Sequence, residues 1–430
     1  MKKQSWTLYI ALRWFRPGKN SGPSLVPAAA GIAVGVAALL TVMAVMNGFQ
    51  KGFIDAVLEL DSFHLRSELS GNASFSEAMD YAQKILKLEN DKNLHGTRKR
   101  PVITATPFID IRTLVSGSKG KTRAARIKVV PDNIFDTDPG FTKLLQIRAG
   151  SFGNGLCLGS ELARQLNLRV GDTVSVLELS SDEEEGIAFD MLDIAVSGIY
   201  NSGYYEFDSG LAFIDHSSSK GLGSIGSWSV GLKLHDRYAD MSTKSWLEKQ
   251  GFGNLLSWRV YNRSFFGALR MEKTIMIMLI GLIFVVVGVN IFHSMRKTVF
   301  NRTEDIATLK AIGANSMDLK KVFILDGLTT GVGGASAGLI LGLLFSFNIN
   351  LIFGAIENVA ALVYHLLGGR GRAFEIFSPS YFYITRVPVS LAYKEVLFIA
   401  LSGALSAVLA ALAACSKFSR IMPSEVLRNE

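Results

Sequence analysis

The chain has 430 residues, of which 45 are lysine or arginine and 37 are aspartate or glutamate, and its mean hydropathy is +0.28. Only 19% of the residues are charged and 49% are hydrophobic, which excludes a long disordered protein and a protein that wraps nucleic acid. A pure bundle of membrane helices would be more apolar, so membrane segments combined with a water-soluble part are predicted. Two cysteines, Cys157 and Cys415, are too few for a disulfide scaffold or a cysteine-rich zinc site.

Four uncharged apolar runs are long enough to cross a bilayer: residues 25–49, 274–292, 327–356 and 396–416. A helix needs about 20 residues to cross roughly 30 Å of hydrocarbon. A buried core helix is the alternative for any single run, but four separate runs favour membrane spans. A cleaved signal peptide is not expected, because Arg13 and Arg16 interrupt any early apolar stretch, so the first run is interpreted as a retained anchor.

The charges between the spans predict the topology. The excess of basic residues lies in the N-terminal amphipathic segment 1–24, the loop 293–326 and the tail 417–430, whereas the segments 50–273 and 357–395 are nearly neutral. Positively charged short segments stay in the cytoplasm. Both termini are therefore predicted inside, and the segments 50–273 and 357–395 outside. The basic balance reports topology and contact with anionic lipid, and no nucleic-acid partner is expected.

The outside segment 50–273 has the pattern of a mixed α+β domain inserted between the first two of four transmembrane helices. Ser74 and Glu77 fit a capping box at the start of an amphipathic helix. Alternating apolar residues predict strands, and 3.6-residue periodicity predicts helices. The expected helices are 74–88, 160–166 and 238–249, and the expected strands are 108–115, 123–130, 173–179, 187–200, 211–214, 229–234 and 255–261.

One acidic run interrupts this domain between two expected strands: Asp182, Glu183, Glu184 and Glu185. The simpler interpretation is a solvated hairpin tip. The functional alternative is a docking loop for a partner outside the membrane.

The sequence contains no catalytic constellation. None of the six histidines is spaced to pair on one helix face for zinc, so no metal site is expected. The stretch Gly120-Lys121-Thr122 resembles the end of a phosphate-binding loop, but Val115 stands where that loop needs its first glycine. We therefore expect a non-catalytic chain that binds no ATP itself. The absence of charged residues from all four runs argues against an ion-coupled transporter.

Glycines recur at four-residue spacing in the first and third spans. Gly31 and Gly35 lie in the first, and the third contains Gly327, Gly331, Gly334, Gly338 and Gly342. This spacing lets helix backbones approach closely. We interpret these glycines as helix-packing positions, some of them at a subunit interface, although general glycine enrichment in membranes is the alternative.

The inside loop 293–326 contains a short charged helical pattern. Residues 301–305 lead into an apolar and charged stretch that Gly313 closes. Such a helix can lie in a groove of another protein, and a plain amphipathic connector is the alternative.

Several of these segments together resemble a known family. They are Ile10-Ala11-Leu12-Arg13-Trp14, Gly31-Ile32-Ala33-Val34-Gly35-Val36, Val45-Met46-Asn47-Gly48-Phe49, the positions Leu255, Ser257-Trp258, Asn262 and Glu272-Lys273, then Glu304-Asp305-Ile306-Ala307, Lys310-Ala311-Ile312-Gly313-Ala314, Pro423-Ser424-Glu425-Val426-Leu427-Arg428 and Glu430. In this order they resemble the permeases of the MacB/FtsX superfamily of ABC transporters, most closely the lipoprotein-releasing LolC/LolE type. The segment 381–389 matches the family's outer loop only in part.

The resemblance implies partners and a mechanism. It implies a bacterial inner-membrane complex in which this chain pairs with a second permease, a copy or a paralogue, and with two copies of a separate ATPase that binds ATP and Mg²⁺. The complex would lift lipoproteins from the outer leaflet by mechanotransmission and pass them to a periplasmic carrier protein. The acidic run at 182–185 lies roughly where one of the two paralogous permeases carries a hairpin that docks this carrier.

The resemblance also implies roles for individual residues. Those expected to couple to the ATPase are Arg302, Glu304, Asp305, Ile306, Leu309, Lys310 and Gly313. Those expected to contact lipoprotein acyl chains are Val42, Met43, Met46, Phe49, Met276 and Met278, because methionine is flexible and apolar. Lipid exposure or ordinary helix packing is the alternative for each methionine.

Two other functions stay open within the same superfamily. One is a MacB-like exporter of a peptide, drug or toxin, which usually has its ATPase fused in one chain. The other is an FtsX-like transducer that regulates cell-wall hydrolases and tends to have a smaller outside domain.

Overall fold

The computed structural model describes residues 26–69, 73–90, 101–117, 120–182, 186–219, 222, 227–366 and 387–415, with the side chains at 89–90, 178–182 and 186–190 outside this description. The chain divides into two compact units. The helical unit comprises 1–51, 269–376 and 386–430, and the sheet unit comprises 52–268 and 377–385. The terminal segments 1–24 and 417–430, with the family motifs they contain, lie outside the described residues.

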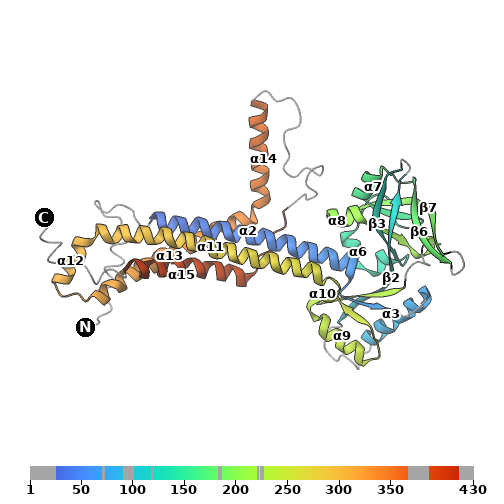
Figure 1. The fold of residues 1–430 in the computed structure, drawn as a ribbon, viewed down its shortest axis with the longest axis horizontal. Coiled ribbons are helices and arrows are strands. Elements are labelled where there is room, and N and C mark those ends of the chain that lie inside the picture. The colour runs from blue at the N-terminus through green and yellow to red at the C-terminus, as the bar shows by residue number, and fades with distance from the viewer. Residues whose placement is uncertain are drawn as a thin grey trace. The chain divides into compact units, whose positions relative to one another are not determined.

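The helical unit is built around four long helices that run side by side: α2 (Val26–Ala56), α11 (Arg263–Asn301), α13 (Ser316–Phe347) and α15 (Tyr393–Cys415) (Figure 1). The short helix α12 (Thr303–Ala311) joins α11 to α13, and α14 (Ile349–Leu366) follows α13. By length and composition, five described helices could cross a membrane: α2 with its extension, α11, α13, α14 and α15. Long apolar helices therefore lie where the sequence has its apolar runs, and α14 is additional.

The third predicted span, residues 327–356, is wrong as a single helix. α13 ends at Phe347, and Asn348 leaves helical geometry while its side-chain Nδ2 donates to the carbonyl of Leu344 at 2.9 Å. An asparagine competes for backbone hydrogen bonds in this way and favours helix ends. α13 also begins well before the apolar run, so the buried Asp326 lies within it.

Glycines bring three of these helices into close contact. A Cβ atom on Gly334 would lie 2.7 Å from the carbonyl oxygen of Ala29, and one on Gly338 would lie 2.6 Å from that of Ala33. The residue numbers increase in the same direction along both helices, from Gly334 with Ala29 to Gly338 with Ala33, so α2 and α13 run parallel. Gly342 continues this contact against Leu40 and Ala37, and Gly35 lies against Val287 of α11, while Gly31 faces open space in this chain.

The contact between α13 and α15 runs the other way. Gly327 lies against Ala411, and Gly331 lies against Ala407 and Ala404. Because the residue numbers of α13 rise along this contact while those of α15 fall, α15 is antiparallel to α13. The five glycines of α13 that the sequence singled out thus all pack against helices of the same chain.

In its described residues, the sheet unit contains ten strands in one mixed sheet. Their bounds are β1 (Leu65–Glu68), β2 (Val102–Ser116), β3 (Thr122–Val130), β4 (Gln146–Gly150), β5 (Leu156–Gly159), β6 (Thr173–Asp182), β7 (Gly186–Asn201), β8 (Leu211–Asp215), β9 (Ser229–Leu234) and β10 (Leu255–Ser257). The helices are α3 (Phe75–Asn90), α5 (Ile134–Thr137), α6 (Pro139–Leu144), α7 (Ser160–Leu166), α8 (Tyr205–Gly210), α9 (Asp240–Lys249) and α10 (Trp258–Tyr261).

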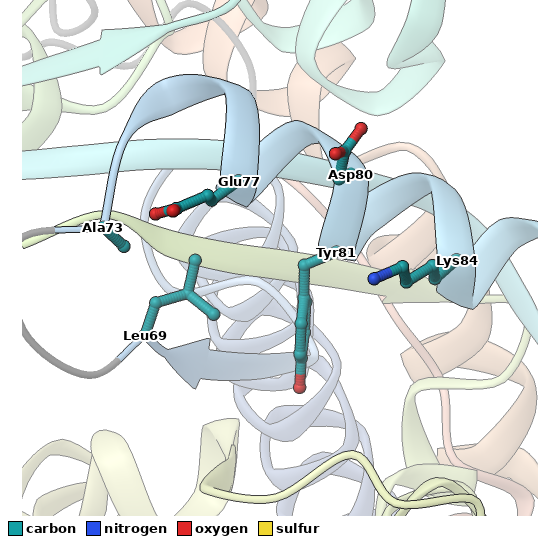
Figure 2. A pocket seen from close by; sticks show the side chains of 6 residues that line it. All are labelled: Leu69, Ala73, Glu77, Asp80, Tyr81 and Lys84. Carbon is teal, nitrogen blue, oxygen red and sulfur yellow. The ribbon is translucent and has the colours of Figure 1, made fainter.

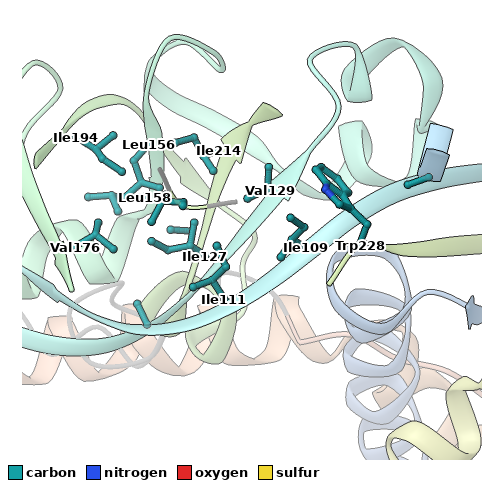
Figure 3. Packing of buried hydrophobic residues seen from close by; sticks show 14 of the residues in the cluster. Ile109, Ile111, Ile127, Val129, Leu156, Leu158, Val176, Ile194, Ile214 and Trp228 are labelled. Atoms are coloured by element: carbon teal, nitrogen blue, oxygen red, sulfur yellow. The ribbon is translucent and has the colours of Figure 1, made fainter. Parts of the chain in front are cut away.

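The long strand β2 belongs to two parts of this sheet. Its first half pairs with β9, which leads on to β1 and β10. Its second half pairs with β3 and β6, and the pairings β3–β8, β8–β5, β5–β7 and β7–β6 close this part into a ring. Apolar side chains from the strands of the ring point toward one another and form its core, including Ile111, Ile127, Leu158 and Val176 (Figure 3).

The predicted α+β class of this part is confirmed, and most of its elements lie where the pattern placed them. The capping box is present, because the backbone N–H of Ser74 donates to Glu77 and the N–H of Glu77 donates to Ser74 Oγ. The strand predicted at 255–261 is too long: Ser257 accepts a hydrogen bond from the N–H of Arg259 and caps α10, so helix replaces strand from Trp258 onward.

Candidate functional site

The first candidate site is α12 at one end of the helical unit. Glu304 and Asp305 are exposed in its first turn, where acidic groups favour the helix dipole. Ile306 is fully buried in a cluster with Leu319 and Phe323 of α13. The helix therefore exposes a charged outer face, and its inner face packs against α13.

The remaining predicted coupling residues flank this arrangement. Arg302 precedes the first turn of α12, Lys310 lies in its last turn, and Leu309 packs against the Ile306 cluster. Gly313 follows with φ +104°, a left-handed conformation that ends the helix at low cost only for glycine. All seven residues thus belong to α12 or its two ends.

Asp326 of α13 is a buried acid near this end of the unit. It is 1% exposed, and neither carboxylate oxygen has a hydrogen-bond partner among the residues that the structure describes. The positive charge that acts on it belongs to Arg302.

The residues predicted to contact acyl chains do not share one environment. Val42 and Met278 are exposed, at 49% and 67%. Met46 and Phe49 are half-buried. Met43, by contrast, is buried among α2, α11 and α15, and Met276 packs partly against the same core. Met43 therefore stabilises the bundle in this chain, whereas Val42 and Met278 are accessible to lipid.

A polar cluster ties three helices together at the opposite end of the unit from α12. Glu395 of α15 accepts hydrogen bonds from Asn47 of α2 and from Lys273 of α11. Gln50 of α2 also donates to Glu272 of α11 at 3.2 Å. Asn47, Glu272 and Lys273 are among the residues that carry the family resemblance.

The second candidate site lies in the sheet unit, where α2 ends in a π-helical turn, η1 (Val57–Ser62). The last carbonyl groups of a helix lack partners within it. Here Lys233 of β9 donates to the carbonyl of Glu59 at 2.9 Å, and Lys128 of β3 donates to the carbonyl of Leu60 at 3.1 Å. Lys128 also donates to the carbonyl of Asp61. Two lysines from the sheet therefore cap the end of the helix.

Carboxylates balance these buried charges. Lys233 forms ion pairs with Asp138 at 2.6 Å and Glu59 at 2.7 Å. The other ion pairs join Asp61 to Arg126 and Lys128, and Asp110 to Lys128 and Arg66. We refer to η1 with these four bases and four acids, Arg66, Arg126, Lys128, Lys233, Glu59, Asp61, Asp110 and Asp138, as the helix-end joint. A buried charge is tolerated when it is paired in this way.

The titration of the joint follows from burial and pairing. Burial lowers the pKa of Lys128, against the opposing attraction of Asp110 and Asp61. Burial also acts to lower the pKa of Arg126, but the attraction of the adjacent Asp61 carboxylate together with that of Asp110 raises the pKa of Arg126 overall. The network is thus held by mutual pairing rather than by solvent.

Phe63 fixes the geometry directly after the π-helical turn. Its backbone has φ 56° and ψ 176°, which is a strained conformation for any residue except glycine. Its ring stacks on Phe108 at 4.9 Å and lies over Gly231, where a Cβ atom would collide with it. Lys128 lies 5.3 Å from the centre of the same ring. Packing therefore holds the chain in a sharp turn from helix to strand.

His64, the next residue, gives the joint a pH dependence. Its Nδ1 accepts a hydrogen bond from the N–H of Leu234 at 2.6 Å, and burial, with Lys233 and Arg237 nearby, lowers its pKa from 6.5 to about 4. A depressed folded-state pKa stabilises the protein above pH 6.5, and this stabilisation is lost as pH falls toward 4. We expect unfolding of the sheet unit in the full chain to become easier by about 3 kcal/mol from pH 7 to pH 4 through this residue.

The matched variant is His64→Asn, whose side-chain oxygen can accept the same hydrogen bond but does not titrate. Thermal unfolding in detergent at several pH values measures the difference between the two proteins. Parallel pH profiles for wild type and variant would contradict the assignment.

A shallow pocket lies beside α3, lined by Leu69, Ala73, Glu77, Asp80, Tyr81 and Lys84 (Figure 2). Its side chains carry both charges, and the Tyr81 hydroxyl is hydrogen-bonded to Ser67. Nothing in it resembles a catalytic arrangement. Across the described ranges, no three His, Cys, Asp or Glu side chains gather as a metal site would require. The acidic run Asp182–Glu185 lies at the β6–β7 connection, with residues 183–185 and the Asp182 side chain outside the described part.

Two family models match this chain. An FtsX-like permease C-terminal domain matches residues 277–423, and a MacB-like periplasmic core domain matches residues 26–237. Together they cover most of the helical unit and most of the sheet unit.

Curated relatives match from end to end. A lipoprotein-releasing system transmembrane protein LolC from Xylella fastidiosa (strain 9a5c) is 28% identical, with 98% of each chain covered. LolC from Neisseria meningitidis serogroup B is 26% identical, over 98% of this chain and 99% of the relative. LolE from Haemophilus influenzae is 23% identical over the same shares. Among solved structures, the periplasmic region of MacB from Actinobacillus actinomycetemcomitans is 13% identical with a TM-score of 0.28, covering 47% of this chain and 93% of that one.

Proposed function

We propose a function from the premise that this chain belongs to the MacB/FtsX superfamily of ABC transporter permeases and is of its LolC/LolE type. It is a permease subunit with several membrane helices. In the proposal, it sits in the inner membrane with both termini in the cytoplasm and serves a complex that extracts lipoproteins from the outer leaflet. The observation that carries the proposal is similarity over 98% of both chains to a LolC protein.

In the proposed complex, this chain pairs with a second permease and with two copies of a separate ATPase, which binds ATP and Mg²⁺. The chain itself does no chemistry. Its exposed Glu304 and Asp305 face the ATPase, and the buried Ile306 passes movement of α12 to α13. The glycine contacts between α13 and α2 pass it on along α2.

The outer end of this route is the helix-end joint. Because Lys128 and Lys233 bond the last carbonyls of η1 to two strands, a displacement of α2 moves the sheet rather than only bending the chain. The proposed result is mechanotransmission: the outside domain lifts the lipoprotein and passes it to a periplasmic carrier. Val42 and Met278 are the accessible candidates for contact with its acyl chains, and the acidic run at 182–185 is the candidate for contact with the carrier.

Depletion of this protein in its host tests the proposal. Acylated proteins are followed through membrane fractionation, and they are expected to accumulate in the inner membrane. An unchanged distribution together with a division defect would favour a transducer, and an unchanged distribution with drug sensitivity would favour an exporter. Either outcome would overturn lipoprotein release.

The coupling role of α12 is tested by Glu304→Lys combined with Asp305→Lys. Reversing both charges is expected to leave the chain inserted but to uncouple ATP hydrolysis from release, because the outer face of α12 changes sign while the Ile306 contact remains. Helix destabilisation should be small, about 0.3–1 kcal/mol for each charge at this terminus. The Glu304→Gln, Asp305→Asn variant is the control for charge removal alone. Normal release by the charge-reversed protein would contradict the coupling role.

A further inference from the structure

The helix α14 differs from the other long helices of its unit. It is apolar and 18 residues long, yet none of its residues is buried. It points away from the bundle of α2, α11, α13 and α15 instead of lying along it (Figure 1). Its length and hydropathy alone would also fit a fifth membrane crossing.

The two ends of the excursion from α13 to α15 meet. Asn350, at the start of α14, accepts a hydrogen bond from the N–H of Val387 at 2.8 Å and donates to the carbonyl of the same residue at 3.2 Å. Three residues later the N–H of Ser390 donates to the carbonyl of Ala44 in α2 at 2.9 Å. The chain therefore returns to the end of the bundle from which it left.

This return is incompatible with a crossing by α14. α15 packs antiparallel to α13, so α15 begins on the side of the membrane where α13 ends. The chain between the two helices therefore makes no net crossing. If α14 crossed, residues 367–386 would have to cross back. That stretch contains Arg370, Arg372, Glu375 and Arg386, which a membrane span does not tolerate.

The sequence of α14 has two faces. At 100° per residue, Asn350, Glu357, Asn358 and His365 fall within one sector, together with the small residues Gly354 and Ala361. The opposite sector, about twice as wide, holds Ile352, Ile356, Val359 and Val363. An apolar face opposite a polar one lets a helix lie along a membrane surface. The polar face of α14 carries Glu357 as its one formal charge and contains no lysine or arginine.

We propose that α14 lies along the outer leaflet of the inner membrane, at the boundary between lipid headgroups and acyl chains. Val359 and Val363 enter the acyl region, and Glu357 and His365 face water. Its ligand is the lipid surface of the bilayer. Val359 and Val363 are 61% and 48% exposed in this chain, so they are free to enter lipid. The inference does not depend on lipoprotein release.

Nitroxide labels on the full chain in nanodiscs of phosphatidylethanolamine and phosphatidylglycerol test this. Single cysteines replace Val359 and Val363 on the apolar face, and Asn358 and His365 on the polar face as matched controls. None of these side chains is buried, and the native Cys157 and Cys415 are buried and protected from labelling. Accessibility to oxygen and to a water-soluble nickel complex is then measured at each site.

Labels at Val359 and Val363 are expected to favour oxygen, at a depth of about 5–10 Å, while labels at Asn358 and His365 favour nickel. A crossing helix would place the labels at Asn358 and Val359 near the bilayer centre, where both would favour oxygen, and would overturn the proposal. Nickel access at all four sites would show a helix in water. Protection of Val359 from both reagents would show that protein covers it. Each of the last two results also overturns the proposal.

Discussion

Replacing Lys233 with Met and Asp138 with Asn in one chain is expected to leave ATP hydrolysis within about twofold of wild type while lipoprotein release falls about tenfold. The double variant removes the bond from Lys233 Nζ to the carbonyl of Glu59 and both ion pairs of Lys233, with Asp138 and with the Glu59 carboxylate. The end of η1 then loses its attachment to β9. Movement of α2 should consequently reach the sheet less completely, although the ATPase still turns over.

The paired design separates function from folding. Lys233→Met alone would leave Asp138, which is fully buried, without its cation, at a cost of about 3–5 kcal/mol. Asp138 also accepts hydrogen bonds from the N–H groups of Gly140 and Phe141 as the cap of α6, and asparagine can replace it in this role. The double variant should therefore be more stable than Lys233→Met alone.

The control is Lys244→Met with Glu248→Gln, which removes an ion pair on the surface of α9 and is expected to change neither activity. A measurement without substrate accompanies it. Amide hydrogen exchange across η1, within the sheet unit, should be faster in the joint variant than in the wild type. Unchanged exchange with normal release would refute the role of the joint, whereas faster exchange in a protein whose wild type releases no lipoprotein would count against the proposed function instead.

The sequence was informative where pattern and environment agree. The apolar runs locate long apolar helices, and the alternation in residues 50–273 locates most strands, because burial on one face imposes these periods. The short helix α12 was predictable because it combines an acidic first turn with Gly313, whose φ of +104° requires a glycine.

The helix-end joint was missed because its charges lie far apart in the sequence. Glu59, Lys128, Asp138 and Lys233 come from four different elements, and only the pairing order β9–β2–β3 brings them to η1. A weak signal existed. Lys233 is the one charged residue in β9, a strand in which every residue is buried. A lysine inside such a strand needs a buried acceptor, but the sequence alone does not say which.

The division of the third span was missed for a different reason. Hydropathy is continuous from Gly327 to Ile356, so composition gives no boundary. Local hydrogen bonds end α13. The Asn348 side chain donates to the carbonyl of Leu344, and the Asn350 side chain forms two hydrogen bonds with the backbone of Val387. These two asparagines mark where the chain leaves the bundle.

Gly338→Leu is expected to destabilise the helical unit by about 1–3 kcal/mol, the range for overpacking a close contact. A Cβ atom at this position would lie 2.6 Å from the carbonyl oxygen of Ala33 and 2.8 Å from Cβ of Val36. Because Ala33 contributes backbone, a rotamer change cannot relieve the clash, and α2 must move away from α13. Thermal unfolding in detergent measures the loss.

Gly333→Leu is the matched control, since it lies in the same helix and the same apolar stretch but has no heavy atom within 4 Å of its Cβ position. It adds the same side chain and should leave the unfolding midpoint nearly unchanged. The contrast separates close helix approach from a general need for small residues in the membrane. Equal destabilisation by both variants would mean that Gly333 also faces protein, which would point to a second chain on that side of α13. Neutral behaviour of both would show that α2 and α13 are not in contact through Gly338.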